Sequence, residues 1–428
     1  MKFKEFETII IGGGQAGLSV SYHLKLKGRN HIVLEQAAQA ANAWRNHRWD
    51  SFTLNTPNWQ SQLAGSGIPG KDPDNFLSRD ELVRYFENYI RQNQLPIWYG
   101  THVLSVKAEW TGYNVETTTG AFRAKNVVVA TSLYQKPRIP RFNGALSSDI
   151  RQLHSDFYRN PQSLPDGAVL VVGSAQSGAQ IAEELYQNGR KVYLSVSRSG
   201  RVPRRYRGRD INWWSNVLGL YGRTVDQLKY PREKFGGKPH ISGTKGGHTL
   251  NLHQFANDGV TLLGRVTELD GDTVKLAHDL HKNLAAADRW EANFVARIDS
   301  YIEKHGLTIP QEILPQFTAG FEQPERNDLD LSQANIRSVI WATGYSFDFS
   351  MVRLPTFDAD GYPIQQRGVT DYAGLYFIGL PWLHNAKSGL LFGVSEDAAH
   401  IASHIASREE YEASSSTTHA DAEVAYEL

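Results

Sequence analysis

Cysteine is absent from this 428-residue chain, and neither sign of charge is in excess, because 45 Lys and Arg residues balance 45 Asp and Glu residues. Without cysteine, the protein has no disulfide, no thiolate zinc site, no cysteine-ligated iron–sulfur cluster and no redox-active dithiol. A net charge of zero gives no overall field that would attract nucleic acid or an anionic membrane. We therefore expect neither as a partner.

Long apolar runs are also lacking. The run closest to the N-terminus is three isoleucines, 9–11, far short of the roughly 7–15 apolar residues of a signal peptide or the ~20 of a membrane span. This favours a cytoplasmic protein. His400 and His404 have no H-E-x-x-H motif and no third ligand beside them, so no metal site is expected. The absence of G-x-S-x-G disfavours a serine hydrolase.

A glycine-rich motif follows the first buried strand, which we expect at residues 8–11. The sequence of residues 12–17 fits G-x-G-x-x-G, with a helix after it. In this motif Gly12 makes the tight turn, Gly14 lets the backbone approach a pyrophosphate, and Gly17 lets the helix pack on the strand. A second strand ends in an acid of the kind that binds a ribose diol. The residues expected to contact this first dinucleotide, which would be FAD, are Gly12, Gly14, Gln15, Ala16, Gly17, Glu35 and Gln36.

The same unit occurs a second time, with a strand at residues 168–172 and the motif at residues 173–178. Ala175 stands where the middle glycine is usual, so the phosphate must lie slightly farther away. The next strand ends in Ser197 and Arg198, and an arginine there accommodates a 2′-phosphate. This predicts NADPH as the second dinucleotide. The alternative for Arg198 is that it is a solvated surface arginine without a role in binding. The expected contacts are Gly173, Ser174, Gln176, Ser177, Gly178, Ser197, Arg198 and Arg205.

Six arginines lie between residues 198 and 209. Because the chain is neutral overall, we interpret them as lining the mouth of the second nucleotide site rather than as a nucleic-acid surface. A Gly- and Lys-rich stretch around residues 236–247 is either a lid, a substrate-side insertion or a structural hairpin. The apolar spacing of residues 285–302 predicts a helix that packs on this insertion.

Three further segments complete a family pattern: residues 127–131, with an Ala-Thr turn, residues 339–345, with a second one, and the strand-like residues 374–379. Together with both glycine motifs, they make the chain resemble the flavin-containing monooxygenase-like (class B) flavoproteins, closest to bacterial putative flavin-dependent oxidoreductases. The resemblance spans roughly residues 5–405. It adds the following expected cofactor contacts: Trp44, Val103, Ala130, Thr131, Ala342, Thr343, Gly344 and Gly379.

The resemblance implies an α/β fold with two dinucleotide-binding Rossmann-like domains of the three-layer ββα type, the NADPH domain being inserted into the FAD domain. We expect the FAD domain at residues 1–160 and 331–406. The NADPH domain is expected at 161–330, with a substrate-side insertion around 205–260. The segment 407–428 has few large apolar residues and is expected to be disordered.

The family's monooxygenase fingerprint, F-x-G-x-x-x-H-x-x-x-(F/Y), is met at His154 and Tyr158, whereas Ser148 and Ile150 replace its Phe and Gly. His154 either couples NADPH to the flavin or fixes the hinge between the domains. Asn55 matches the family asparagine that points at the flavin and is the expected catalytic residue. The alternative interpretation is that Asn55 only forms a turn before Pro57 by bonding its own backbone.

What the resemblance implies is an NADPH-dependent FAD monooxygenase, in which a C4a-(hydro)peroxyflavin oxygenates a small amine or thioether. Its partners would then be a small-molecule substrate and dioxygen, and a homodimer is left open. The alternative is an NADPH:acceptor flavin oxidoreductase without oxygen transfer. A third hypothesis is a sensing protein that keeps both nucleotide sites but turns over slowly.

Overall fold

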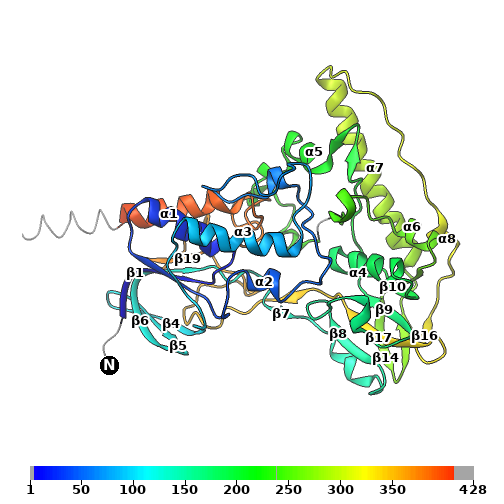
Figure 1. Cartoon of the computed structure of the whole chain (residues 1–428), viewed down its shortest axis with the longest axis horizontal. Coiled ribbons are helices and arrows are strands. Elements are labelled where there is room, and N and C mark those ends of the chain that lie inside the picture. Colours follow the sequence, from blue (N-terminus) through cyan, green and yellow to red (C-terminus); the bar gives the residue numbers. More distant parts are fainter. Residues whose placement is uncertain (1–3, 238, 409–428) are drawn as a thin grey trace, which may run out of the picture.

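The computed structural model describes residues 4–237 and 239–408. Figure 1 shows two lobes side by side, one built on the sheet that contains β1 and the other on the sheet that contains β9. Two extended segments cross between the lobes. They carry β7 (Lys136–Pro137) and β18 (Tyr345–Ser346), which pair as an antiparallel ribbon.

The first lobe is built on a seven-stranded sheet in the order β3-β2-β1-β6-β5-β4, with β19 also paired to β6. Its parallel part is lined by β-branched residues that are fully buried, such as Ile9, Ile10 and Val128, as expected for a sheet covered on both faces. The strands β4, β5 and β6 form an antiparallel meander. The bounds are β1 (Lys4–Ile11), β2 (His31–Leu34), β3 (Ile97–Trp98), β4 (Val103–Glu109), β5 (Gly112–Thr117), β6 (Gly120–Val129) and β19 (Leu375–Phe377).

The second lobe repeats this plan. A five-stranded parallel sheet runs in the order β13-β10-β9-β17-β8, and a three-stranded antiparallel meander, β14-β15-β16, accompanies it. The predicted fold class of two Rossmann-type α/β domains is therefore confirmed. The bounds are β8 (Arg151–His154), β9 (Ala168–Val172), β10 (Val192–Ser195), β13 (Thr261–Leu263), β14 (Val266–Asp270), β15 (Thr273–Leu276), β16 (Asp328–Asp330) and β17 (Ile336–Trp341).

Strand pairing corrects the predicted domain boundaries. Strand β8 lies within residues 1–160 and β17 within 331–406, which we assigned to the first domain, yet both belong to the second sheet because β17 pairs with β9 on one side and β8 on the other. The β7–β18 ribbon marks both crossings instead. Sequence alone does not reveal this, because a buried strand carries no sign of which sheet it joins.

The main helices flank the two sheets; α1 follows β1 in the first lobe, and α4 follows β9 in the second. Their bounds are α1 (Gln15–Leu26), α2 (Asn42–Arg45), α3 (Arg79–Gln92), α4 (Gln176–Gln187), α5 (Ile211–Val217), α6 (Leu252–Asn257), α7 (Leu280–Lys304) and α8 (Ala319–Glu322). Short 3₁₀ helices are η1 (Asn58–Gln60), η2 (Arg141–Ala145), η3 (Pro161–Ser163), η4 (Leu220–Gly222), η5 (Val225–Gln227), η6 (Pro231–Phe235) and η7 (Thr244–Gly246).

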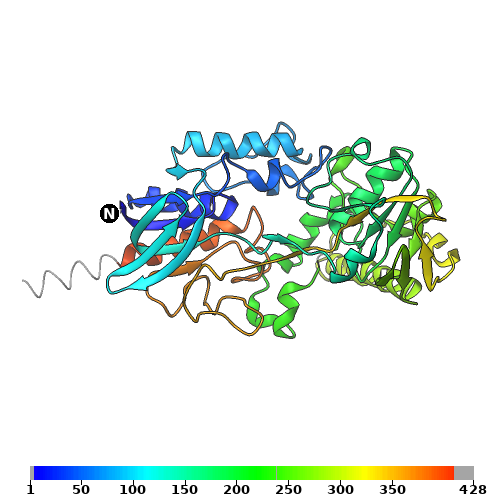
Figure 2. The same cartoon turned by 90° about the horizontal axis from the view of Figure 1, so that it is seen from below.

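The insertion contains a hairpin of β11 (Arg205–Tyr206) and β12 (Arg209–Asp210), followed by α5. Ile298 and Ile302 of α7 pack with Trp214 of α5 in a small separate core, so the predicted packing of this helix on the insertion is confirmed. Beyond α5 the chain reaches back to the first lobe, where Val225 N donates to His384 O (2.9 Å). Figure 2 shows this green segment extending below, toward the orange loops of the first lobe.

A last helix covers residues 394–408 of the described chain. Residues 407 and 408, the start of the segment expected to be disordered, are thus helical. The rest of that segment, 409–428, lies outside the described residues. His404, on this helix, has its Nδ1 3.0 Å from the Tyr376 hydroxyl oxygen.

Candidate active site at two glycine loops

The first glycine loop, residues 12–17, has the geometry that its sequence predicts. Gly12 has φ +107°, and a Cβ there would lie 2.8 Å from the carbonyl oxygen of Ala130. A Cβ on Gly17 would lie 1.9 Å from Gly12 O, so only glycine lets the helix approach the strand this closely. In contrast, a Cβ on Gly14 would meet nothing within 4 Å. Open space in front of Gly14 is what a pyrophosphate requires.

The start of α1 is free to bind an anion. Its N-cap residue, Gly14, provides no side-chain hydrogen bond to the first turn, so the N–H groups of that turn remain available to phosphate oxygens. Glu35, at the end of β2, accepts hydrogen bonds from Gly13 N (2.7 Å) and Ala37 N (2.8 Å). Its carboxylate therefore lies directly beside the loop, where a ribose diol would be bound.

The second glycine loop, residues 173–178, reproduces this arrangement. Gly173 has φ +105°, and a Cβ there would lie 2.6 Å from Ala342 O; a Cβ on Gly178 would lie 1.8 Å from Gly173 O. Ala175 replaces Gly14 as the N-cap and has φ −73° and ψ −170°, which any L-residue adopts. Both loops thus have the shape that holds a dinucleotide. The two Ala-Thr turns have the same role, which is to pack against a glycine loop. The carbonyl oxygen of Ala130 faces Gly12, and that of Ala342 faces Gly173.

The end of β10 lies against the second loop. Ser197 N donates to Ser174 Oγ (3.1 Å), and Ser174 Oγ donates to Ser197 O (3.3 Å). Arg198 follows and is exposed, with no ion pair among the described residues. An unpaired guanidinium at this point is available to a 2′-phosphate.

Other predicted contacts surround the first loop. Gly379 follows β19, and a Cβ on it would lie 2.5 Å from the Cβ of Ala16 in α1. Val103, which opens β4, is buried and comes two residues after Thr101, whose N donates to Glu35 O (2.9 Å). Gln36 is exposed just past Glu35.

Further predicted residues have partners within the protein. Trp44 lies in α2, with its ring 5.9 Å from that of Phe52. Thr131 Oγ1 accepts from Gln135 (3.1 Å), and Thr343 Oγ1 donates to Arg138 O. The residues Gln15, Ser177 and Gly344 are only partly buried or exposed, and Gln15 Nε2 donates to Gly389 O (3.0 Å). Gln176 makes the corresponding bond in the second loop, to Ile241 O (2.7 Å).

Asn55, the expected catalytic residue, connects the two lobes. It lies in the first lobe, but its Oδ1 accepts a hydrogen bond from Gln180 Nε2 of α4 (3.3 Å), and its main-chain oxygen accepts one from Arg204 Nη1 (2.7 Å). Asn55 Nδ2 has no hydrogen-bond partner in the part of the chain that the structure describes. The amide is therefore oriented with its N–H groups left to donate to a bound group.

The arginine run does not line one mouth, contrary to our interpretation. Arg201 pairs with Asp288 and Glu291, Arg204 with Asp210, and Arg207 with Asp299. Arg205, expected to contact the cofactor, instead donates to the carbonyls of Gly246 (2.8 Å) and Gly247 (3.0 Å). These arginines hold the insertion together, because Asp210 lies nearby in the sequence and the other carboxylates and carbonyls are brought to face them by the fold.

His154 is fully buried and fixed by the main chain. Its Nε2 lies 2.9 Å from Gly344 O, to which it donates, and its Nδ1 accepts from Asp156 N (3.1 Å). Burial lowers the pKa of His154, so the ring is neutral near pH 7. These bonds tie β8 to the turn before β18 and support the hinge interpretation of His154 over a role in coupling NADPH to the flavin.

Tyr158, the fingerprint aromatic, is also fully buried, and its hydroxyl donates to Glu184 Oε2 of α4 (2.8 Å). Burial and this carboxylate raise the pKa of Tyr158, and burial raises the pKa of Glu184. Ser51 of the first lobe donates to the other oxygen of Glu184 (2.7 Å). Sequence reasoning missed Gln180, Glu184 and Arg204 as contacts between the lobes, because a polar residue on a helix face or in a loop gives no signal of its partner.

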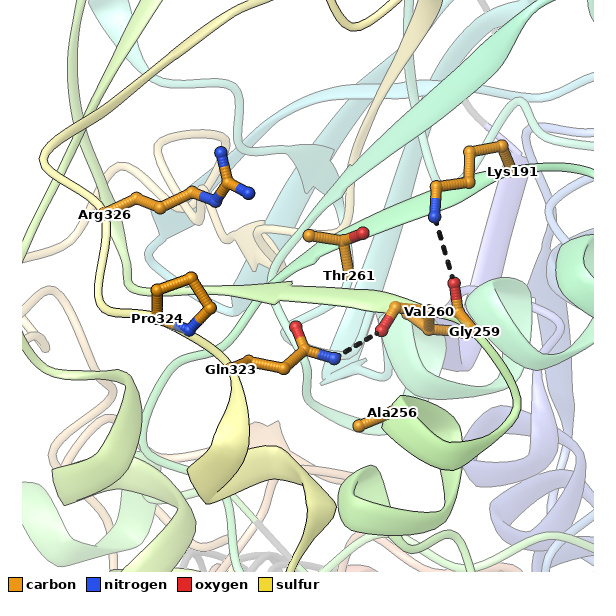
Figure 3. Close-up of a pocket in the computed structure, with 8 residues that line it drawn as sticks. All are labelled: Lys191, Ala256, Gly259, Val260, Thr261, Gln323, Pro324 and Arg326. Atoms are coloured by element: carbon orange, nitrogen blue, oxygen red, sulfur yellow. Dashed lines mark hydrogen bonds between the residues drawn. The ribbon is translucent and has the colours of Figure 1, made fainter.

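A hollow of about 290 Å³ lies elsewhere on the second lobe. Figure 3 shows its lining side chains, Lys191, Ala256, Gly259, Val260, Thr261, Gln323, Pro324 and Arg326. Lys191 and Thr261 stand at the amino ends of β10 and β13, whereas the nucleotide loop follows the carboxyl end of β9. The hollow is thus separate from the nucleotide site.

No helix within residues 4–237 and 239–408 is both long and apolar enough to cross a membrane.

Comparison with known proteins identifies the family of the chain. Residues 9–210 match the pyridine nucleotide-disulphide oxidoreductase family. An uncharacterised CzcO-like oxidoreductase of Geobacillus kaustophilus is 33% identical over 397 residues, which cover 92% of this chain and 97% of that protein. A related CzcO oxidoreductase of Bacillus subtilis is 32% identical, over 92% and 98% of the two chains.

Among solved structures, a flavin-containing monooxygenase from Stenotrophomonas maltophilia has a TM-score of 0.65 at 19% identity, covering 95% of this chain and 99% of that one. At this identity the likeness establishes the fold. The family resemblance predicted from the motifs is confirmed by these CzcO-like relatives. The chain belongs to the CzcO-like oxidoreductases.

Proposed function

We propose that this protein is an NADPH-dependent FAD monooxygenase that oxygenates a small nucleophile, an amine or a thioether. The first glycine loop and Glu35 would hold FAD, and the second loop with Ser197 and Arg198 would hold NADPH. The structural likeness to a cyclohexanone monooxygenase from Rhodococcus sp. Phi1 that was solved with NADP⁺ bound (TM-score 0.57, 15% identity, 96% of this chain and 85% of that one) supports this pairing.

The observation that carries the proposal is the position of Asn55. It belongs to the lobe of the first glycine loop and is bonded to α4, the helix that begins at the second loop. Its main-chain oxygen is held by Arg204. A donor at this junction can stabilise negative charge on a group bound between the lobes.

When held by the two glycine loops, the cofactors would supply the redox chemistry, namely hydride transfer and the activation of dioxygen. The protein contributes binding, orientation and exclusion of water. The backbone of the two loops would bind phosphate, Gln180 orients the Asn55 amide, and Arg204 of the insertion holds the Asn55 carbonyl.

An isotope experiment tests the proposal. The purified protein with FAD is supplied with NADPH, ¹⁸O₂ and methyl phenyl sulfide as a model thioether. Monooxygenation transfers one ¹⁸O atom into the sulfoxide for each NADPH oxidised. If NADPH is consumed with stoichiometric H₂O₂ and unlabelled sulfide, the proposal fails.

The fingerprint residues favour a second candidate, an NADPH:acceptor oxidoreductase without oxygen transfer. Ser148 and Ile150 replace the family's Phe and Gly, and His154 is enclosed by main-chain partners. Anaerobic reduction of a quinone by NADPH, together with failure of the ¹⁸O transfer, would identify this activity.

A further inference from the structure

Arg204 is an unusual residue because its side chain is only 2% exposed although it carries a permanent charge. It lies in the insertion, in the chain between β10 and β11. Its Nε and Nη2 both donate to Asp210 Oδ2, at 2.9 and 2.6 Å. The guanidinium carbon lies 4.3 Å from the centre of the Phe76 ring.

The remaining nitrogen of Arg204 points to the candidate catalytic residue. Nη1 donates to the main-chain oxygen of Asn55 at 2.7 Å. Asn212 Nδ2 reaches the same oxygen at 3.5 Å, and Asn212 is itself held, since its N donates to Asp210 Oδ1 (2.8 Å) and its Oδ1 accepts from the Tyr221 hydroxyl (2.6 Å). The insertion thus grips the carbonyl of Asn55 while Gln180 holds its side chain.

Lysine could not replace Arg204 in this arrangement. A guanidinium has five N–H donors in a planar fork, so it can bind a carboxylate and a carbonyl and still stack on an aromatic ring. An ammonium is a compact point charge on a flexible stem. Because Asp210 neutralises the charge, the guanidinium provides direction and rigidity at Asn55 rather than a free positive charge.

We propose that Arg204 is a positioning residue for Asn55: through the Asn55 carbonyl it fixes the direction in which the Asn55 amide N–H groups point at the flavin. The insertion would then complete the oxygenation site of the first lobe. This inference rests on the proposed function. It predicts that loss of Arg204 separates reduction of the flavin from productive use of oxygen.

The test compares four proteins, each with FAD bound: wild type, R204K, the double variant R204M/D210N and the control R207M. The double variant removes both buried charges together, since removing one alone would leave the other unpaired. Arg207 belongs to the same arginine run, but its guanidinium pairs with Asp299 (2.9 Å) on α7.

Two measurements are made. Hydrogen exchange detected by mass spectrometry reports the rigidity of residues 50–60, independently of activity. The ratio of H₂O₂ released to NADPH oxidised reports how much oxygen is wasted, while anaerobic stopped flow gives the rate of flavin reduction.

For R204M/D210N we expect at least fivefold faster exchange in residues 50–60 and a several-fold higher H₂O₂ ratio, with flavin reduction within twofold of wild type. R204K should be intermediate and R207M unchanged. In an Asn55→Ala background, R204M/D210N should add no further H₂O₂, because the group that Arg204 positions is already gone.

The inference is overturned if R204M/D210N keeps both the hydrogen-exchange rate of residues 50–60 and the H₂O₂ ratio of wild type. It is also overturned if R204M/D210N raises the H₂O₂ ratio in the Asn55→Ala background by as much as it does in wild type. If the wild type itself transfers no oxygen, the proposed function fails. The hydrogen-exchange measurement still tests the contact of Arg204 with Asn55, because an unchanged exchange rate of residues 50–60 in R204M/D210N would reject a positioning role for that contact. If R204M/D210N does not fold, the same measurements of hydrogen exchange and of the H₂O₂ ratio are made on R204K.

Discussion

The substitution Gly14→Ala separates binding of the first dinucleotide from folding. A Cβ at Gly14 would meet no protein atom within 4 Å, and the residue has φ −79°, which alanine adopts without strain. The free energy of unfolding of the apoprotein should therefore change by less than about 1 kcal/mol. The methyl group would, however, occupy the space through which the pyrophosphate approaches the backbone.

The expected loss of affinity follows from the contacts at stake. A hydrogen bond to a charged group contributes about 1.5–3 kcal/mol. Loss of one N–H to phosphate bond should thus raise the Kd for FAD about tenfold to 150-fold. Gly17→Ala should behave differently, because its Cβ would lie 1.9 Å from Gly12 O, and such overpacking destabilises the fold itself by about 1–3 kcal/mol.

The assay combines FAD titration, followed by quenching of flavin fluorescence, with thermal unfolding of the apoprotein. Gly67→Ala is the matched control, since Gly67 is exposed and also has nothing near its Cβ. A Gly14→Ala protein that is as stable as wild type and binds FAD with an unchanged Kd would refute the assignment of this loop to the pyrophosphate.

Three further predictions concern other parts of the site. Arg198→Gln should lower the preference for NADPH over NADH, measured as the ratio of kcat/KM values, at least tenfold; an unchanged ratio would leave Arg198 as a surface residue. Asn55→Ala should leave anaerobic flavin reduction by NADPH unchanged but raise H₂O₂ release, and unaltered coupling would exclude its proposed role. Burial lowers the pKa of His240 to about 4. As the pH drops below about 6.5, His240 is therefore protonated in the unfolded chain before it is protonated in the folded protein, and the free energy of unfolding falls. His240→Gln should remove about 2 kcal/mol of the stability lost between pH 7 and pH 5 in urea unfolding; an identical pH slope would contradict this.

The sequence by itself determined the two glycine loops, because their requirements are local. Gly12 and Gly17 need a positive φ or the absence of a Cβ, and β-branched runs such as residues 8–11 favour buried strands. Spacing along the chain also identified Glu35 beside the first loop, since a strand and a helix of known length set its position.

The tertiary structure alone decided which residues meet across the lobes. Strands β8 and β17 joined the second sheet, against the predicted boundaries, because pairing partners are chosen by the packed fold and not by the strand. Arg204 differs from the other arginines of its run only in its neighbours, Asp210, Phe76 and Asn55, of which two are more than a hundred residues away in the chain. A charged residue is directed into a site or into the protein by the partners that folding places around it, and those partners leave no mark in the local sequence.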